Sequence, residues 1–165
     1  MHETAVSDMD DLRRSLVGLL PKLRRFAMTL ACDAADADAL VLQACERAIA
    51  KSPMHESEAR LDEWIYTLTR TLWAEEARKR PPRATQASHD PASRERISSA
   101  HPLHETILSM PEGLASVFVL VNVEGRSYGE AAGILGIPVA TVTARLSAAR
   151  LKMAMIVAEE EARRA

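Results

Sequence analysis

The stretch that decides the fold runs over residues 127–152 and reads SYGEAAGILGIPVATVTARLSAARLK. Ser127 and Glu130 have the spacing of a capping box, which favours a helix that begins just after Ser127. Gly136 stands where a helix often ends in left-handed backbone, and Pro138 suits the opening of a second helix. The stretch therefore predicts a short helix, a glycine-containing turn and a longer helix, which is typical of a helix-turn-helix unit.

The second helix of this unit has a charge distribution that suits DNA. From Pro138 to Met155 the sequence holds three basic residues and no acidic one. The N-terminal half of such a helix can enter the major groove and read base edges. An ordinary helical hairpin with a solvated basic face is the alternative. The residues expected on the outer surface of this helix are Thr141, Thr143, Arg145, Ser147, Arg150 and Lys152.

The N-terminal half shows apolar periodicity of the helical kind in three segments. The first segment spans residues 12–30 and contains Pro21, where we expect a kink or a break. The second follows Asp33, which is a suitable N-cap, and the third stops before Pro81. We therefore expect a three-helix domain over residues 8–80.

The rest of the chain divides into a linker and a second domain. Residues 83–100 lack apolar periodicity and are rich in Ser, Ala, Arg and Pro, which predicts flexibility. We place the linker at 81–101 and the helix-turn-helix domain at 102–156. Alanine and leucine dominate and β-branched runs are rare, so the predicted fold class is all-α with two helical domains.

Composition excludes several classes of protein. The 165 residues carry a net charge of −2, which does not suit a non-specific DNA coater, although a local basic patch can still bind DNA. The polar N-terminus is unlike a signal peptide and no apolar stretch reaches membrane-spanning length, so we expect a cytoplasmic protein without a membrane span. The sequence shows no phosphate loop, nucleophile elbow or closed set of metal ligands. We therefore expect no enzyme activity, no catalytic residues, no cofactor and no metal.

Both halves resemble the extracytoplasmic-function (ECF) sigma factors of bacterial RNA polymerase. Residues 110–150, from MPEGL to SAAR, resemble region 4 of that family. LLPKLRRFA (19–27), ADADALV (35–41) and EWIYTLTRTLW (63–73) resemble region 2, and the linker falls where the family has its own. The EAA run at 130–132 and the Leu-Leu-Pro opening resemble the alphaproteobacterial general-stress branch.

This resemblance implies a protein that binds core RNA polymerase and directs it to promoter DNA during transcription initiation. It further implies a role in a stress response and regulation by an anti-sigma factor, which would hold the protein inactive. The polymerase contact would lie on the helix at about 35–50. A solvated charged face is the alternative reading of each residue there. The residues implied at the polymerase contact are Asp36, Asp38, Gln43, Glu46 and Arg47.

The resemblance also implies two contacts with DNA. The loop at 51–59 matches the one that captures a flipped −10 base, and the next helix matches the segment that holds the melted strand. Trp64 lies in the apolar stripe of that helix and is expected in the core. The residues implied at the −10 element are Met54, His55, Ser57, Tyr66, Arg70, Thr71, Trp73, Arg78 and Lys79. The residues implied at the −35 element are Arg126, Ser127, Thr141, Thr143, Arg145, Ser147 and Arg150.

The sequence departs from the family at four positions. Thr143 and Ala148 replace residues that are usually basic, Thr71 replaces a common Asn, and Leu42 adds an apolar side chain near the polymerase-facing side. Because fewer phosphate contacts weaken binding and flatten its salt dependence, we expect weak autonomous −35 affinity or a different −35 preference. Two alternatives stay open. One is a sigma-like decoy that binds an anti-sigma factor without directing transcription, and the other is a plain helix-turn-helix regulator, which would usually dimerise.

Overall fold

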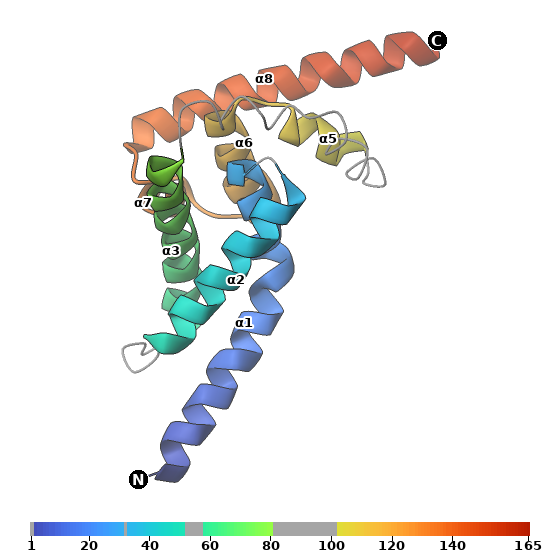
Figure 1. The fold of residues 1–165 in the computed structure, drawn as a ribbon. Coiled ribbons are helices and arrows are strands. Elements are labelled where there is room, and N and C mark those ends of the chain that lie inside the picture. Colours follow the sequence, from blue (N-terminus) through green and yellow to red (C-terminus); the bar gives the residue numbers. More distant parts are fainter. Residues whose placement is uncertain (1, 32, 52–57, 81–101) are drawn as a thin grey trace.

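The computed structural model describes residues 2–31, 33–51, 58–80 and 102–165, which are almost entirely helical and contain no strand. The all-α fold class is confirmed for this part of the chain. The elements in chain order are α1 (His2–Ala31), α2 (Ala34–Ala50), α3 (Glu58–Lys79), α5 (Pro102–Leu108), α6 (Glu112–Phe118), the π-helix η3 (Val119–Val123), α7 (Tyr128–Leu135) and α8 (Val139–Arg164) (Figure 1).

Helices α1, α2 and α3 pack on one another as the expected three-helix bundle. The turn between α1 and α2 is fixed by Asp33, whose carboxylate accepts a hydrogen bond of 3.0 Å from the backbone N–H of Asp36. Removing a large apolar side chain from water contributes about 1.5–3 kcal/mol, so this core accounts for much of the bundle's stability. Its buried apolar side chains include Leu23, Phe26, Leu40, Ile65 and Leu72.

Helix α1 runs through Pro21 without a break, so of the expected kink or break, the break does not occur. A proline inside a helix removes one backbone donor and crowds the preceding turn. Pro21 itself is exposed, whereas Leu19 and Leu23 on either side of it are buried. Packing of these leucines against the bundle offsets the missing hydrogen bond and keeps the helix continuous.

Helix α6 passes into η3, which widens the last turn before the helix-turn-helix unit. The backbone N–H of Glu124 donates to the carbonyl of Val119 over 2.8 Å, which is the five-residue spacing of a π-turn. The chain then reverses at Gly125, which has a φ of 68° that favours glycine. This geometry sets Glu124 and Arg126 beside the first three helices.

The helix-turn-helix unit forms as predicted. The hydroxyl of Ser127 accepts from the N–H of Glu130 (3.1 Å), and the N–H of Ser127 donates to the Glu130 carboxylate (2.8 Å), which completes the capping box. Gly136 ends α7 with φ 64° and ψ 36°, in left-handed backbone. The chain turns by 104° between α7 and α8, within the range of DNA-binding helix pairs.

The two halves of the molecule share one hydrophobic core. Phe26 and Ile65 from the first half and Leu120 and Ile134 from the second belong to the same buried cluster. Helix α7 lies against α3, and α6 lies against α1 (Figure 1). The predicted bounds 8–80, 81–101 and 102–156 stay predictions, because the linker falls outside the described residues.

Both ends of the described chain extend away from this packed body. In Figure 1 the first turns of α1 and the last turns of α8 project in different directions. Within the described ranges, no single helix is both long enough and apolar enough to cross a membrane.

Candidate nucleic-acid interface

Helix α8 carries most of the residues expected at the −35 element, and its packing decides which of them face outward. Val142, Leu146 and Ala149 are fully buried and hold α8 against α6 and α7. This leaves the opposite side of the helix exposed, as the sequence predicts. Of the residues expected to read DNA, Thr143, Ser147 and Arg150 are exposed, whereas Thr141 and Arg145 are half-buried.

The hydroxyl groups on this helix are bonded to its own backbone. Thr143 Oγ1 donates to the carbonyl of Val139 (3.1 Å), and Ser147 Oγ donates to the carbonyl of Thr143 (3.0 Å). Both bonds span one helical turn, which fixes each rotamer. Each hydroxyl oxygen still has lone pairs that can accept a hydrogen bond from a base.

Two of the arginines of α8, Arg145 and Arg150, lie against neighbouring helices. Arg150 donates to the side-chain oxygen of Asn122 over 2.9 Å. The Arg145 guanidinium covers the backbone of Gly113, where an added Cβ would stand only 3.0 Å from Nη1. Glycine at 113 therefore makes room for Arg145 on α6. The charges of both arginines are directed to the flank of α8 and not to its outermost face.

The arginine expected to hold a phosphate, Arg126, lies between the two halves of the molecule. It donates to the Asp62 carboxylate over 2.9 Å, and its guanidinium lies 5.2 Å from the ring centroid of Tyr66. The Arg126 side chain is only 14% exposed. Although burial acts against it, the hydrogen bond with Asp62 raises the pKa of Arg126 above its ordinary value. Ser127 is exposed but serves as the N-cap of α7.

The structure describes only some of the residues expected at the −10 element. Met54, His55 and Ser57 lie outside the described residues. Thr71 is exposed on α3, and its hydroxyl donates to the carbonyl of Thr67 over 2.9 Å. Thr71 is therefore accessible at the position where Asn is common in the family.

The last turns of α3 keep two cations in solvent. Arg78 and Lys79 are exposed, as a phosphate contact requires. Trp73 is half-buried, and Arg80 lies over its ring at 5.2 Å from the centroid, a cation–π contact. Trp64 is also half-buried against the core, as expected for an apolar-stripe residue.

Two further −10 candidates on α3, Tyr66 and Arg70, are covered by the second half of the molecule. Tyr66 is 1% exposed and meets Phe26 edge to face, with ring centroids 5.3 Å apart. Burial, with a smaller contribution from Glu124, raises the pKa of Tyr66 to about 12. Arg70 donates to the carbonyl of Ile134 in α7 over 2.6 Å. In this arrangement of the two halves, which we call closed, Tyr66 is buried, and Arg70 is partly exposed but bonded to α7.

Two of the acidic residues expected at the polymerase contact lie near the start of α2, and both are already paired. Asp36 accepts from Arg80 over 2.9 Å, and Asp38 accepts from Arg24 over 2.7 Å. These pairs join α2 to α3 and to α1, so the two carboxylates also have a role in packing. Leu42 is 60% exposed on the same helix and presents an apolar side chain, as expected.

The remaining polymerase candidates share an open groove between α2 and α3. Gln43, Glu46 and Arg47 are exposed and form its α2 wall. The α3 wall combines one apolar side chain with charges of both signs, which suits a polar protein surface better than a nucleic acid. Its residues are Leu72, Glu75, Glu76 and Lys79.

The contacts between the two halves are the part of the site that the sequence did not predict. Arg25 donates to Glu124 over 2.8 Å, and the Glu124 side chain is only 1% exposed. The hydroxyls of Thr29 and Ser116 lie 3.0 Å apart in the core. These partners are far apart in the chain, so no local motif marks them. Among the described residues, no group of three or more His, Cys, Asp or Glu side chains could hold a metal ion.

Comparison with known proteins finds the same two regions in the same order. Residues 16–70 match the family model described as the Sigma2 domain of PhyR, and residues 100–153 match the one described as Sigma-70, region 4. A curated relative is the ECF RNA polymerase sigma factor EcfG of Rhodopseudomonas palustris (strain TIE-1). It is 29% identical over 154 residues, which cover 89% of this chain and 85% of that protein.

Solved structures share the fold. The sigma factor RpoE from Bartonella quintana, in complex with the anti-sigma factor NepR, matches with a TM-score of 0.68 and 23% identity over 89% of this chain and 96% of its own. CnrH, in complex with the cytosolic domain of CnrY, matches with a TM-score of 0.64 and 19% identity over 94% and 95%. The anti-anti-sigma factor PhyR from Bartonella quintana, in complex with NepR, matches with a TM-score of 0.55 and 19% identity over 88% and 50%.

The two sigma regions lie in the order and at the positions that the sequence resemblance implies. They extend over most of a curated ECF sigma factor, and the helix-turn-helix geometry of α7 and α8 agrees with region 4. The chain therefore combines a sigma region 2 domain with a sigma-70 region 4, and it is homologous to an extracytoplasmic-function RNA polymerase sigma factor.

Proposed function

We propose that α8 reads the −35 element, that α3 and the loop before it hold the −10 element, and that α2 contacts core RNA polymerase. One observation carries this proposal: a helix-turn-helix with a 104° turn follows a three-helix bundle that ends in exposed cations. The bundle and the helix-turn-helix match sigma region 2 and sigma region 4 respectively.

At the −35 element, Thr143, Ser147 and Arg150 are the exposed candidates of α8. Hydroxyl oxygens accept from base edges, and an arginine freed from Asn122 can reach a base or a phosphate. Arg145 reaches DNA only if it leaves Gly113. This supports the expectation of weak −35 binding by the chain alone.

At the −10 element, the closed arrangement covers part of the proposed surface. Separation of α7 from α3 would release Arg70 from the Ile134 carbonyl and uncover Tyr66, and the same movement would free Arg126 from Asp62 for a phosphate. We infer that promoter binding requires this opening and that binding to polymerase favours it. A ligand shifts such an equilibrium by its difference in affinity for the two arrangements.

We also propose that an anti-sigma factor holds the protein inactive in a stress response. The supporting observation is the likeness to RpoE in its complex with the anti-sigma factor NepR, in which that sigma factor is bound. An anti-sigma factor that binds only the closed arrangement would keep Tyr66 and Arg70 covered. Because the proposed partners include core RNA polymerase, we propose a cytoplasmic location.

Transcription in a reconstituted system tests these assignments. Core RNA polymerase with the wild-type chain is expected to produce transcripts from a subset of a promoter library. The double variant Arg145→Ala, Arg150→Ala is expected to lose them while it still binds polymerase. The matched control is Arg163→Ala, Arg164→Ala, which removes two exposed arginines from the far end of the same helix.

The same experiment separates the sigma factor from the decoy. The decoy has one observation in its favour, because the region 2 match is to the Sigma2 domain of PhyR and an anti-anti-sigma factor PhyR shares the fold. A decoy would bind an anti-sigma factor but not core polymerase. Failure to bind polymerase would therefore overturn the proposed function and favour the decoy.

A further inference from the structure

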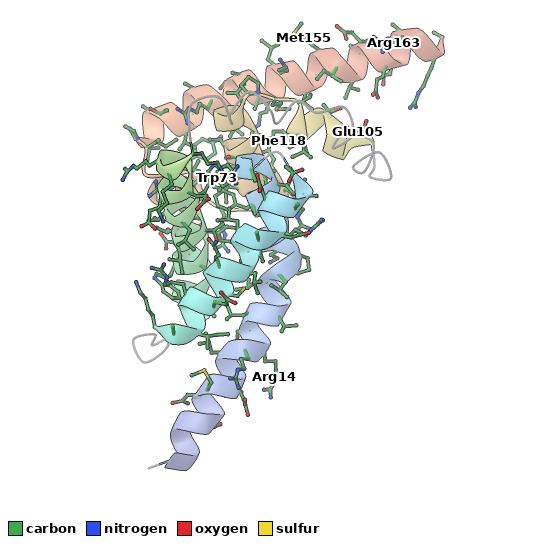
Figure 2. All side chains as sticks on the ribbon, viewed as in Figure 1. Arg14, Trp73, Glu105, Phe118, Met155 and Arg163 are labelled. Carbon is green, nitrogen blue, oxygen red and sulfur yellow. The ribbon has the colours of Figure 1, made fainter. Side chains whose placement is uncertain are left out.

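The outer face of α8, directly opposite its buried face, carries no charge over more than five turns. With about 3.6 residues per turn, seven exposed residues fall on one line along this side. Two of them are large apolar side chains, Leu151 at 64% and Met155 at 56% exposure. Figure 2 shows Met155 on the side of α8 that points away from the other helices. The residues of this outer face are Ala140, Ala144, Ala148, Leu151, Met155, Ala158 and Ala162.

A solvated helix normally places charged and polar residues opposite its buried face. Here that position is uncharged, and the nearby cations Arg145 and Arg150 are directed to the flanks. The face also extends past the helix-turn-helix core into the part of α8 that projects in Figure 1. An uncharged, apolar stripe of this length suits packing against another helix better than contact with phosphates.

The charges beside this face change sign along the helix. The basic residues Arg145, Arg150 and Lys152 come first. The acidic run Glu159–Glu161 follows them, and the helix ends in Arg163 and Arg164, so its charge is positive before Met153 and net negative by one after it. We propose that the occupant of the face is the α8 helix of a second copy of this chain, packed antiparallel. In that orientation each acidic block lies alongside the basic segment of the other copy, whereas a parallel pair would bring like charges together.

The apolar residues fit a two-fold arrangement centred on the large side chains. In an antiparallel pair, Leu151 of each copy packs against Met155 of the other, and Ala148 lies opposite Ala158. Small alanines let the two helices approach closely, at the usual interaxial distance of roughly 8–10 Å. One helix from each copy forms a modest interface, so the association is expected to depend on protein concentration.

This pairing would block the −35 contact. Thr143 and Ser147 border the outer face, so a second copy would cover the side chains that are proposed to read DNA. Self-association and −35 binding then exclude each other. This consequence rests on the proposed function, whereas the pairing itself does not.

Sedimentation equilibrium of the full chain tests the pairing. We expect the average mass to rise from 18.1 kDa towards twice that value with concentration. Leu151→Glu, Met155→Glu is expected to raise the dissociation constant on the order of a hundredfold, because four charges would be buried per dimer. Val17→Glu, at an equally exposed apolar residue of α1, is the matched control and leaves association unchanged. A mass that stays at 18.1 kDa up to millimolar concentration, or equal loss in the control, overturns the proposal.

Cross-linking tests the antiparallel orientation. In a background with Cys32→Ser and Cys45→Ser, chains with Ala148→Cys are mixed with chains with Ala158→Cys under oxidising conditions. Antiparallel packing predicts a disulfide between the two kinds of chain and little self-cross-linking of either. Self-cross-linking of Ala148→Cys alone indicates a parallel pair and overturns the proposed arrangement.

DNA binding separates failure of this inference from failure of the proposed function. The cross-linked dimer is expected to bind a −35 duplex at least tenfold more weakly than the same protein after reduction. Equal binding before and after reduction overturns the blocking role. If neither form binds DNA or polymerase while the dimer forms, the proposed function fails and the pairing stands.

Discussion

Helices α3 and α8 are both proposed to contact DNA, but each offers it little accessible positive charge, and the reason differs between the two helices. Arg70 of α3 is hydrogen-bonded to α7, and Arg126 of the second half is hydrogen-bonded to Asp62 of α3. On α8, the outermost face is open to solvent but carries no cation. A covered cation can be released by a conformational change, whereas a missing cation cannot. If the proposed DNA contacts are right, the controllable part of DNA binding therefore lies at the contact between the halves.

Removal of the central arginine is expected to have the largest effect on this contact. Arg126→Ala deletes a hydrogen bond between charged groups and a cation–π contact, and it leaves Asp62 without its partner. Hydrogen bonds to charged groups contribute about 1.5–3 kcal/mol, so we expect the free energy of unfolding to fall by about 2–3 kcal/mol. Urea denaturation measures this loss, and small-angle X-ray scattering is expected to show a larger radius of gyration.

A companion variant separates opening from loss of a DNA contact. Asp62→Asn weakens the pair but keeps the Arg126 charge for phosphate, so promoter binding is expected to rise while stability falls. The control is Asp11→Asn, which disrupts the exposed pair of Asp11 with Arg14 (65% and 79% exposed side chains). Such exposed pairs contribute little. Promoter binding that falls in Asp62→Asn would show that the contact does not restrain the DNA surfaces.

The turn that faces α3 provides the next test. Gly136→Ala places a Cβ in left-handed backbone (φ 64°), 3.2 Å from Nη2 of Arg70. The left-handed backbone conformation alone costs about 1–2 kcal/mol, and the end of the Arg70 guanidinium must also shift slightly to make room for the Cβ. Gly129→Ala is the control, because it lies in α7 and its added Cβ meets only Ser127 Oγ, at an ordinary contact distance of 4.0 Å. A loss of stability as large in Gly129→Ala as in Gly136→Ala would contradict this account.

The open face of α8 is tested by supplying the missing charge. Thr143→Arg with Ala148→Arg restores cations where the family usually has them. If both reach phosphates, the affinity for −35 DNA is expected to rise about tenfold at moderate salt. The slope of log K against log salt is expected to steepen by roughly 0.9 per contact. Ala158→Arg, which adds a cation nearer the C-terminal end of α8, is the control and is not expected to raise the affinity for −35 DNA. An unchanged salt slope in the double variant would show that this face does not meet the DNA backbone.

Local features of the sequence predicted the local features of the fold well. The capping box at Ser127 and the left-handed Gly136 depend on a few neighbouring residues, and both are confirmed. The N-cap at Asp33 is confirmed for the same reason. Of the kink or break expected at Pro21, the break does not occur, because the burial of Leu19 and Leu23 outweighs the local preference of proline.

Contacts between distant segments could not be predicted in this way. Arg126 and Asp62 are 64 positions apart, and Arg25 and Glu124 are 99 positions apart. Their pairing depends on how two halves pack, and no periodicity or capping signal encodes it. The same packing buries Tyr66, which the resemblance assigns to the −10 surface. The roles proposed for the DNA-contacting and polymerase-contacting residues therefore stay predictions until variants are measured.

The smallest expected effect on stability concerns the capping box of Ser127 and Glu130. It starts α7, the helix that packs against α3. Glu130 accepts from the backbone N–H of Ser127, which holds the pKa of Glu130 below its ordinary value of 4.5. A carboxyl group whose pKa is lower in the folded state than in the unfolded state contributes its full stabilisation at pH values above the unfolded-state pKa. That stabilisation is lost as the pH falls through the folded-state pKa.

Glu130→Gln tests this predicted direction of the pH dependence of stability. Because a glutamine oxygen can still accept the hydrogen bond and Glu130 is exposed, the loss at neutral pH is expected to be below about 0.5 kcal/mol. The difference from wild type should shrink as the pH falls below 4.5. Ser127→Ala is the comparison, since it removes the hydroxyl cap and should cost about 1 kcal/mol at every pH. A difference between Glu130→Gln and wild type that grows on acidification would show that the carboxylate charge is not what stabilises the start of α7.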